Sequence, residues 1–115
     1  MYVDRRTYPR IDTDLPAEVQ MFAGSSIDVR LINLSLGGML VEGGKEVELL
    51  RPLVDGAPLE LSLHFGLNQY PLHCHCRVVY QRRQSQGCIQ LGLSLLSIDD
   101  RALALLQQYI SEQLT

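Results

Sequence analysis

Several features that define common protein classes are missing from this sequence. Its three cysteines are an odd number, which a disulfide framework would not normally leave, so reduced thiols are expected. No apolar run approaches the roughly 20 residues that a membrane-spanning helix needs, and the N-terminus has no apolar signal core. Internal repeats and low-complexity tracts are also absent. We therefore expect a cytoplasmic protein without membrane insertion.

A positive overall charge and a large share of aromatic residues are missing as well. The 115 residues carry a net charge of −3 and are only 6% aromatic, which argues against DNA or RNA as a partner. Positive charge gathers at the start, where Arg5, Arg6 and Arg10 against Asp4 give the first ten residues +2 and leave −5 for the other 105. Apolar residues make up 46%, which suffices for the core of one domain.

Most of the chain alternates between apolar and polar residues with the period of two that is typical of strands. A turn composition at residues 23–26 predicts a hairpin between the first two segments. Residues 43–58 carry three glycines and two prolines and are predicted to be mostly loop. The short connections favour antiparallel pairing. The six predicted strands lie at residues 15–21, 27–31, 39–41, 59–65, 72–80 and 89–95.

The last segment changes to a helical period. Ser97 followed three residues later by Asp100 resembles a capping box, and the pattern predicts a helix from about 98 to 113. We expect this helix to bury its apolar face across one end of the barrel. The residues that recur at spacings of three and four on that face are Leu103, Leu106, Ile110 and Leu114.

These patterns together predict one all-β domain. Its fold is a six-stranded antiparallel barrel, closed or nearly closed, with a C-terminal helix and a flexible N-terminal arm. The predicted boundaries are 1–12 for the arm, 13–97 for the barrel and 98–115 for the helix.

The arm contains the basic segment DRRTYPR at residues 4–10, which lacks helical and strand periodicity. Arginine presents a planar fork of donors that binds phosphate oxygens in pairs, and it can also stack on a base or donate to guanine. Arg6 and Arg10 are four residues apart with Pro9 between them, so the segment can close around a compact dianion. The alternative is a solvated basic tail that binds nothing specific.

A polar turn with two glycines, NLSLGG at residues 33–38, separates two predicted strands. Asn and Ser side chains suit turns, and the glycines let a ligand approach the backbone. The alternative is a tight turn in which Asn33 and Ser35 bond their own backbone. A hydrolase nucleophile elbow of the Gly-x-Ser-x-Gly type is excluded, because Asn33 stands where the first glycine belongs.

The two motifs together resemble the paired signature of PilZ domains, which are bacterial receptors for cyclic di-GMP. The first half of that signature is RxxxR, often preceded by another Arg, and the second half is (D/N)xSxxG. Both halves are complete here, as RRTYPR at residues 5–10 and NLSLGG at 33–38, with one strand pair between them. Weaker similarity covers nearly the whole chain. One departure is that Ser94 and Leu95 stand where an aromatic often follows the Gly-x of the last strand, which is a core position.

The resemblance implies a role for each matching residue. Arg6 and Arg10 match the arginines that contact phosphates and guanine, and Arg5 matches the position that influences whether one ligand or a stacked pair is bound. Asn33 and Ser35 match the polar positions that bond guanine and the ligand backbone. The last glycine of the turn matches the one that keeps the turn open. The predicted site for cyclic di-GMP is Arg5, Arg6, Arg10, Asn33, Ser35, Gly37 and Gly38.

The run HCHC at residues 73–76 contains potential zinc ligands, with Cys88 or His64 available to complete a set of four. In a strand, however, the two cysteines face one way and the two histidines the other. The cysteines continue the apolar stripe of their strand, so we expect them in the core and no metal. The histidines are expected on the outer surface, and no motif assigns Arg77 or Tyr80 to the ligand.

The resemblance implies an adaptor that needs no cofactor. Its arm orders around cyclic di-GMP and thereby changes a surface that a downstream protein partner recognises. The main alternative is a PilZ-like interaction module that binds no nucleotide, for example in pilus assembly. An enzyme is not expected, because no base is paired with a nucleophile and no phosphate loop is present. We expect a monomer or a weak dimer, the latter through apolar residues near Leu49 and Leu50 or on the helix.

Overall fold

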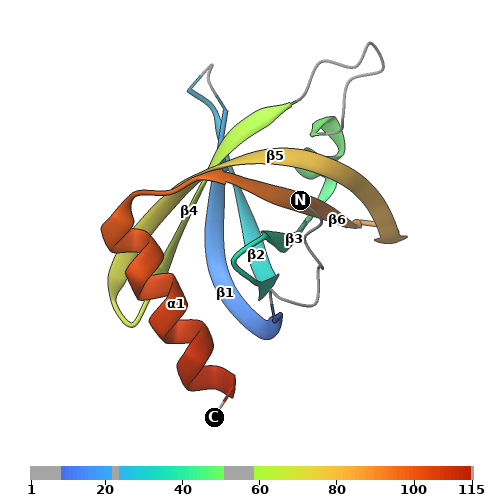
Figure 1. The fold of residues 1–115 in the computed structure, drawn as a ribbon. Coiled ribbons are helices and arrows are strands. Elements are labelled where there is room, and N and C mark those ends of the chain that lie inside the picture. The colour runs from blue at the N-terminus through green and yellow to red at the C-terminus, as the bar shows by residue number, and fades with distance from the viewer. Residues whose placement is uncertain (1–8, 22–23, 51–58, 115) are drawn as a thin grey trace, which may run out of the picture.

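The computed structural model describes residues 9–21, 24–50 and 59–114, and it forms a closed six-stranded barrel with one C-terminal helix (Figure 1). All pairings are antiparallel, in the order β1-β2-β3-β6-β5-β4, and β4 closes the barrel onto β1. The predicted barrel and helix are therefore confirmed. The elements are β1 (Ile11–Gln20), β2 (Ser26–Leu34), β3 (Gly38–Gly43), the 3₁₀ helix η2 (Lys45–Leu49), β4 (Glu60–Leu67), β5 (Tyr70–Ser85), β6 (Cys88–Ser97) and α1 (Asp100–Leu114).

The core is built from the alternate strand residues that face the barrel interior. Each such aliphatic side chain contributes about 1.5–3 kcal/mol by leaving water. The two cysteines of β5 lie among these core residues, as the sequence predicts. The completely buried strand residues are Val19, Leu31, Leu34, Val41, Leu63, Cys76 and Leu91.

The first strand begins earlier than the sequence pattern predicts. Residues 1–8 lie outside the described residues, and β1 already begins at Ile11 instead of after residue 12. Ile11 is buried and pairs with Leu34 of β2, so burial in the core extends the strand toward the N-terminus. Residues 11 and 12 therefore belong to the barrel.

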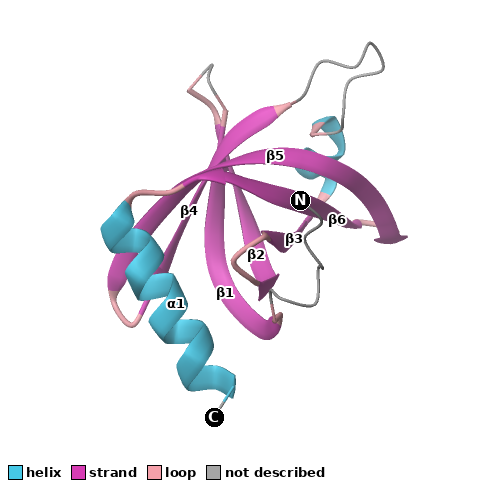
Figure 2. Cartoon of the chain, viewed as in Figure 1, coloured by secondary structure: helices cyan, strands magenta, loops and turns pink. Residues whose placement is uncertain are grey.

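The prediction of a mostly open loop after β3 needs a correction. The segment contains η2, whose Val47 is completely buried. Gln81 of β5 explains this order, because its side-chain Nε2 donates to three carbonyls of the segment, those of Val47, Glu48 and Leu50, at 3.0–3.1 Å. Strand β5 runs to Ser85 rather than to residue 80, because its pairing with β6 continues to Ser85, and it forms the long curved strand in Figure 2.

The residue that caps the helix differs from the one that the sequence pattern predicts. Ser97 is the last residue of β6, and the N-cap is Asp99, whose Oδ1 accepts a hydrogen bond from the backbone N–H of Ala102 at 2.8 Å. Helix α1 lies against β1 and β4. Its buried stripe is Ala102, Leu106 and Ile110, whereas Leu114, which was predicted to be buried, is 53% exposed.

The cap can be tested by comparing Asp99→Ala with Ser97→Ala. Asp99→Ala is expected to lower the free energy of unfolding by about 1 kcal/mol, because the N–H of Ala102 loses its acceptor. Ser97→Ala, at the position that the sequence pattern favoured, should cost much less. Chemical denaturation measures both. Equal losses would contradict the assignment of Asp99 as the cap.

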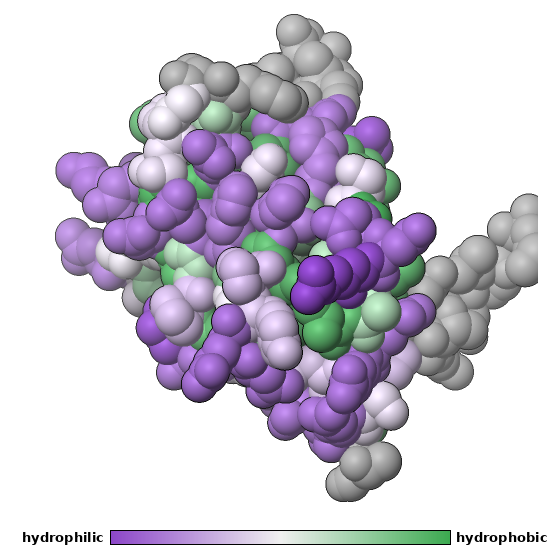
Figure 3. All heavy atoms as spheres, turned by 90° about the vertical axis from the view of Figure 1, so that its left-hand side faces the viewer, coloured by the Kyte–Doolittle hydropathy of each residue, from purple (hydrophilic) through white to green (hydrophobic). Residues whose placement is uncertain are grey.

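The described surface carries few large apolar side chains. On the face where α1 begins, hydrophilic residues predominate and apolar patches are small (Figure 3). Of the pair predicted to be exposed near η2, Leu49 is 80% exposed, whereas Leu50 is buried. None of the described helices has the length and apolarity that a membrane span requires.

Candidate ligand-binding site

A cavity of about 370 Å³ opens on the outer face of the barrel, over β2, β3, β6 and β5. Five residues of the predicted site line it together, although they come from the start of the chain and from the β2–β3 turn. Arg5 and Arg6 lie outside the described residues. The five residues are Arg10, Asn33, Ser35, Gly37 and Gly38.

Seven other residues of the cavity wall carry no motif. Among them, Tyr80 is assigned to a ligand by no motif, and Gly92 is the glycine of the Gly-x pattern in the last predicted strand. The residues of β5 and β6 reach the turn through the register of the strands, which cannot be read from a single sequence. The seven residues are Met39, Leu40, Val79, Tyr80, Gly92, Leu93 and Ser94.

Strand register joins four residues of the cavity wall and one neighbour, Asp12, in a row of cross-strand partners that spans five strands. Each member pairs directly with the next, so the side chains share the outer face of the barrel. We call this set the site row. From β1 to β5, its members are Asp12, Asn33, Leu40, Gly92 and Tyr80.

Gly92 determines how the ring of Tyr80 lies in the site row. A Cβ atom at Gly92 would overlap the ring carbons of Tyr80, so the ring lies flat across β6 where a side chain would otherwise stand. The guanidinium of Arg82 lies 5.4 Å from the ring centroid, within cation–π range. Tyr80 is 38% exposed and therefore offers an aromatic surface to the cavity.

Ser35 holds the β2–β3 turn through its hydroxyl. Its Oγ donates to the carbonyl of Gly38 at 3.1 Å and accepts from the N–H groups of Gly37 and Gly38, both at 3.2 Å. A hydroxyl has one donor and two acceptor sites, so these bonds use its full capacity. The alternative of a turn that bonds its own backbone thus describes Ser35 in this structure.

Asn33 and Arg10 differ from Ser35 in this respect. The amide of Asn33 is half-buried at the cavity wall and makes no side-chain hydrogen bond with the residues that the structure describes. Arg10 is exposed and contributes the charged group among the described residues of the wall. A flat ring, an amide and a guanidinium around one cavity are suited to a purine base with a nearby phosphate.

The candidate zinc ligands lie on opposite faces of the sheet. Cys74 and Cys76 face the core with their sulfur atoms 3.7 Å apart. The hydrogen bond with Cys74, and then burial, raise the pKa of the Cys76 thiol, which favours its protonated form. On the outer face, His64 and His73 stack with ring centroids 5.6 Å apart. No group of three or more donor residues within the described ranges is arranged to hold a metal ion.

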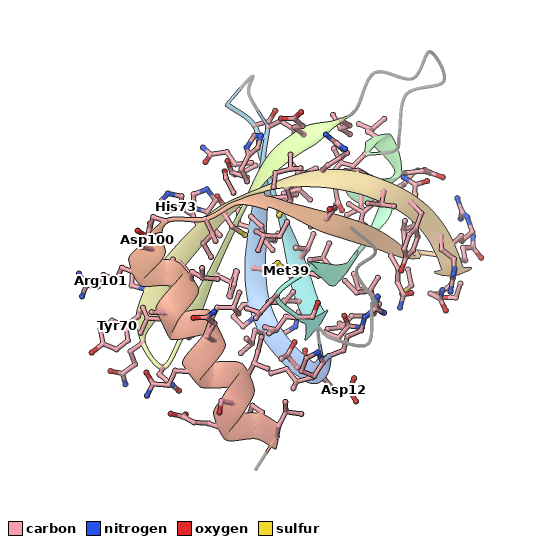
Figure 4. The ribbon with its side chains drawn as sticks, viewed as in Figure 1. Asp12, Met39, Tyr70, His73, Asp100 and Arg101 are labelled. Carbon is pink, nitrogen blue, oxygen red and sulfur yellow. The ribbon has the colours of Figure 1, made fainter. Side chains whose placement is uncertain are left out.

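A smaller cavity of about 260 Å³ lies at the start of α1, away from the predicted site. It is lined in part by Tyr70, His73 and Arg101, and none of the predicted ligand residues takes part. Figure 4 shows these three side chains on the opposite side of the molecule from Asp12. Arg101 can therefore serve as a remote control in binding experiments.

Comparison with known proteins matches residues 4–112 of the sequence to the PilZ domain. No curated protein matches the sequence significantly. Among solved structures, Inhibitor of motility (MotI/DgrA) of Bacillus subtilis has a TM-score of 0.73 at 23% identity, covering 97% of this chain and 53% of its own. The PilZ domain of Escherichia coli YcgR, solved with c-di-GMP, has a TM-score of 0.69 at 19% identity, covering 96% and 92%.

The complex of MrkH from K. pneumonia with c-di-GMP has a TM-score of 0.72 at 14% identity, covering 97% of this chain and 53% of its own. This chain therefore spans about half the length of MotI/DgrA and of MrkH. At these identities the structural matches establish the barrel fold and leave the ligand to be argued from this chain.

Proposed function

The chain belongs to the PilZ domain family, and from that premise we propose that it is a receptor for cyclic di-GMP. The observation that carries the proposal is the convergence of Arg10 with Asn33 and the Ser35–Gly38 turn on one cavity. These residues come from both halves of the family signature, which are separated by a strand pair in the sequence. Two solved relatives contain c-di-GMP, which supports this choice of ligand.

Arginine supplies the charge that the dianionic ligand requires. Arg10 stands at the cavity, and Arg6 precedes it by four residues in the same half of the family signature. Each charge-assisted hydrogen bond contributes about 1.5–3 kcal/mol, so a few of them supply much of the roughly 8 kcal/mol of a micromolar complex. The ordering entropy of the arm reduces the sum.

The cavity wall accommodates the bases. The ring of Tyr80 provides a stacking surface, and the amide of Asn33 provides a donor and an acceptor for a base edge. In this proposal the main role of Ser35 is to hold the shape of the turn. A direct hydrogen bond from Ser35 to the ligand would require one of its three bonds within the turn to break.

The signalling step follows from where the arm is attached. Arg10 directly precedes β1, so closure of the arm over the cavity changes the surface beside the β2–β3 turn. A downstream protein that recognises this changed surface responds to the ligand, which makes the domain an adaptor rather than an enzyme. The cytoplasm is the compartment that this role implies.

Isothermal titration of the whole chain with cyclic di-GMP tests the proposal. The wild-type chain is expected to bind, and Arg10→Ala is expected to weaken binding roughly 10- to 150-fold through the loss of a charge-assisted bond. Higher salt should weaken the wild type more than the variant, because Arg10 acts partly through its charge.

The matched control is Arg101→Ala, which removes the same side chain from the remote cavity at α1 and should leave the affinity unchanged. A wild-type chain that does not bind cyclic di-GMP would refute the receptor function and favour the interaction module that binds no nucleotide. Equal losses in the two variants would indicate a general effect of charge instead of a site at Arg10.

A further inference from the structure

Asp12 is an acidic member of the site row to which neither the family signature nor the proposed function gives a role. It pairs directly with Asn33 across β1 and β2, so their Cβ atoms lie about 5 Å apart on the same face. Its side chain is exposed at the end of β1 (Figure 4). Asp12 is not itself one of the residues that line the cavity, but its pairing partner Asn33 is, so its side chain stands beside the Asn33 part of the wall.

The neighbouring acid of β1, Asp14, has an arginine partner, whereas Asp12 has none among the described residues. A bulge separates Asp12 from Leu15 in the pairing with β2. Arg30 donates from Nε to Oδ1 of Asp14 at 2.8 Å and from Nη2 to its backbone oxygen at 3.0 Å. Within the part of the chain that the structure describes, Asp12 has no such hydrogen bond or ion pair.

A carboxylate beside a bound dianion is unfavourable unless the ligand offers it hydrogen-bond donors. Guanine has two donors on its Watson–Crick edge, N1–H and the 2-amino group, and the two oxygens of a carboxylate can accept both. Adenine instead has an acceptor at N1, which repels a carboxylate. The placement of Asp12 next to Asn33 is thus suited to guanine and unsuited to adenine.

We infer that Asp12 accepts hydrogen bonds from N1–H and the 2-amino group of a guanine at the site row and so selects guanine over adenine. The inference rests on the proposed function, because it requires the cyclic dinucleotide in this cavity. The amide of Asn33 is left to donate to O6 of the same base.

Titration of the whole chain with cyclic di-GMP, cyclic di-AMP and cyclic di-IMP tests this role, since inosine lacks the 2-amino group of guanine. The wild type should bind cyclic di-GMP at least about 10-fold more tightly than the other two. D12N should weaken cyclic di-GMP binding about 10-fold and remove most of the preference over cyclic di-IMP. The matched control D14N makes the same charge change on the same strand and should alter affinity less than about threefold.

The sign of the D12N effect separates recognition from simple repulsion. If Asp12 only repels the phosphates, D12N tightens cyclic di-GMP binding, and this result or an unchanged affinity overturns the inference. Equal weakening by D12N and D14N overturns it as well. Such outcomes leave wild-type binding intact, whereas a wild type that binds no cyclic di-GMP overturns the proposed function together with this inference. Thermal unfolding of D12N, expected to match the wild type, shows that the variant is folded.

Discussion

Leu106→Ala is expected to lower the free energy of unfolding by about 2–5 kcal/mol, the largest loss among the variants considered. Leu106 is completely buried in the middle of the α1 stripe, between Ala102 and Ile110. Alanine is the best helix former, so the helix itself is not weakened and the loss measures packing against the barrel. At roughly 4 °C per kcal/mol for a domain of this size, the melting temperature should fall by about 8–20 °C.

The matched control is Leu114→Ala on the same helix. Its side chain is 53% exposed, so truncation should change stability by only about 0.5 kcal/mol. Chemical denaturation followed by circular dichroism measures both variants. If Leu114→Ala were as costly as Leu106→Ala, the apolar spacing in the sequence would describe the buried face better than the structure does.

Gly38→Ala is expected to have the second largest effect, a loss of about 1–3 kcal/mol in the free energy of unfolding. A Cβ atom at Gly38 would overlap the carbonyl oxygen of Leu93, which is backbone and cannot rotate away. The two paired strands β3 and β6 would have to separate at the site where Ser35 holds the turn. We therefore also expect weaker cyclic di-GMP binding, measured by the same titration.

Gly66→Ala in β4 provides the comparison for Gly38→Ala. A Cβ atom at Gly66 would lie 3.7 Å from the carbonyl oxygen of Tyr70, an ordinary contact. That substitution should be neutral or stabilise the domain by up to about 1 kcal/mol, because it restricts the unfolded chain. A similar loss in both variants would show that the close approach of β3 and β6 is not the cause.

The sequence predicts the barrel well because its evidence is local. Alternation such as that of Leu61, Leu63 and Phe65 follows directly from one buried face. The errors arise where a distant group decides the local structure. Gln81 orders η2 from 31 to 34 residues away, and the helix stripe ends at Ile110 because Leu114 extends past the barrel surface.

In the candidate site, too, the local motifs could be read from the sequence, whereas the contacts between distant strands could not. The motifs place Arg10, Asn33 and the Ser35–Gly38 turn together, and the structure brings them to one cavity. The sequence could not join Asp12 and Tyr80 to them, because that requires the register of five strands. The saturated bonding of Ser35 is likewise a matter of three-dimensional geometry.

The unequal lengths of β4 and β5 bear on self-association. β5 pairs with β4 only as far as Arg77, while its pairing with β6 continues to Ser85. The part of β5 beyond Arg77 therefore has one strand edge that β4 does not cover. An uncovered edge can pair with the backbone of another chain, which is the first step of edge-to-edge aggregation. Among the described residues, Gln81 in this part of β5 holds η2 through its side-chain hydrogen bonds. We therefore expect the 3₁₀ helix to hinder a neighbouring copy of the domain from adding a strand to the barrel at this place.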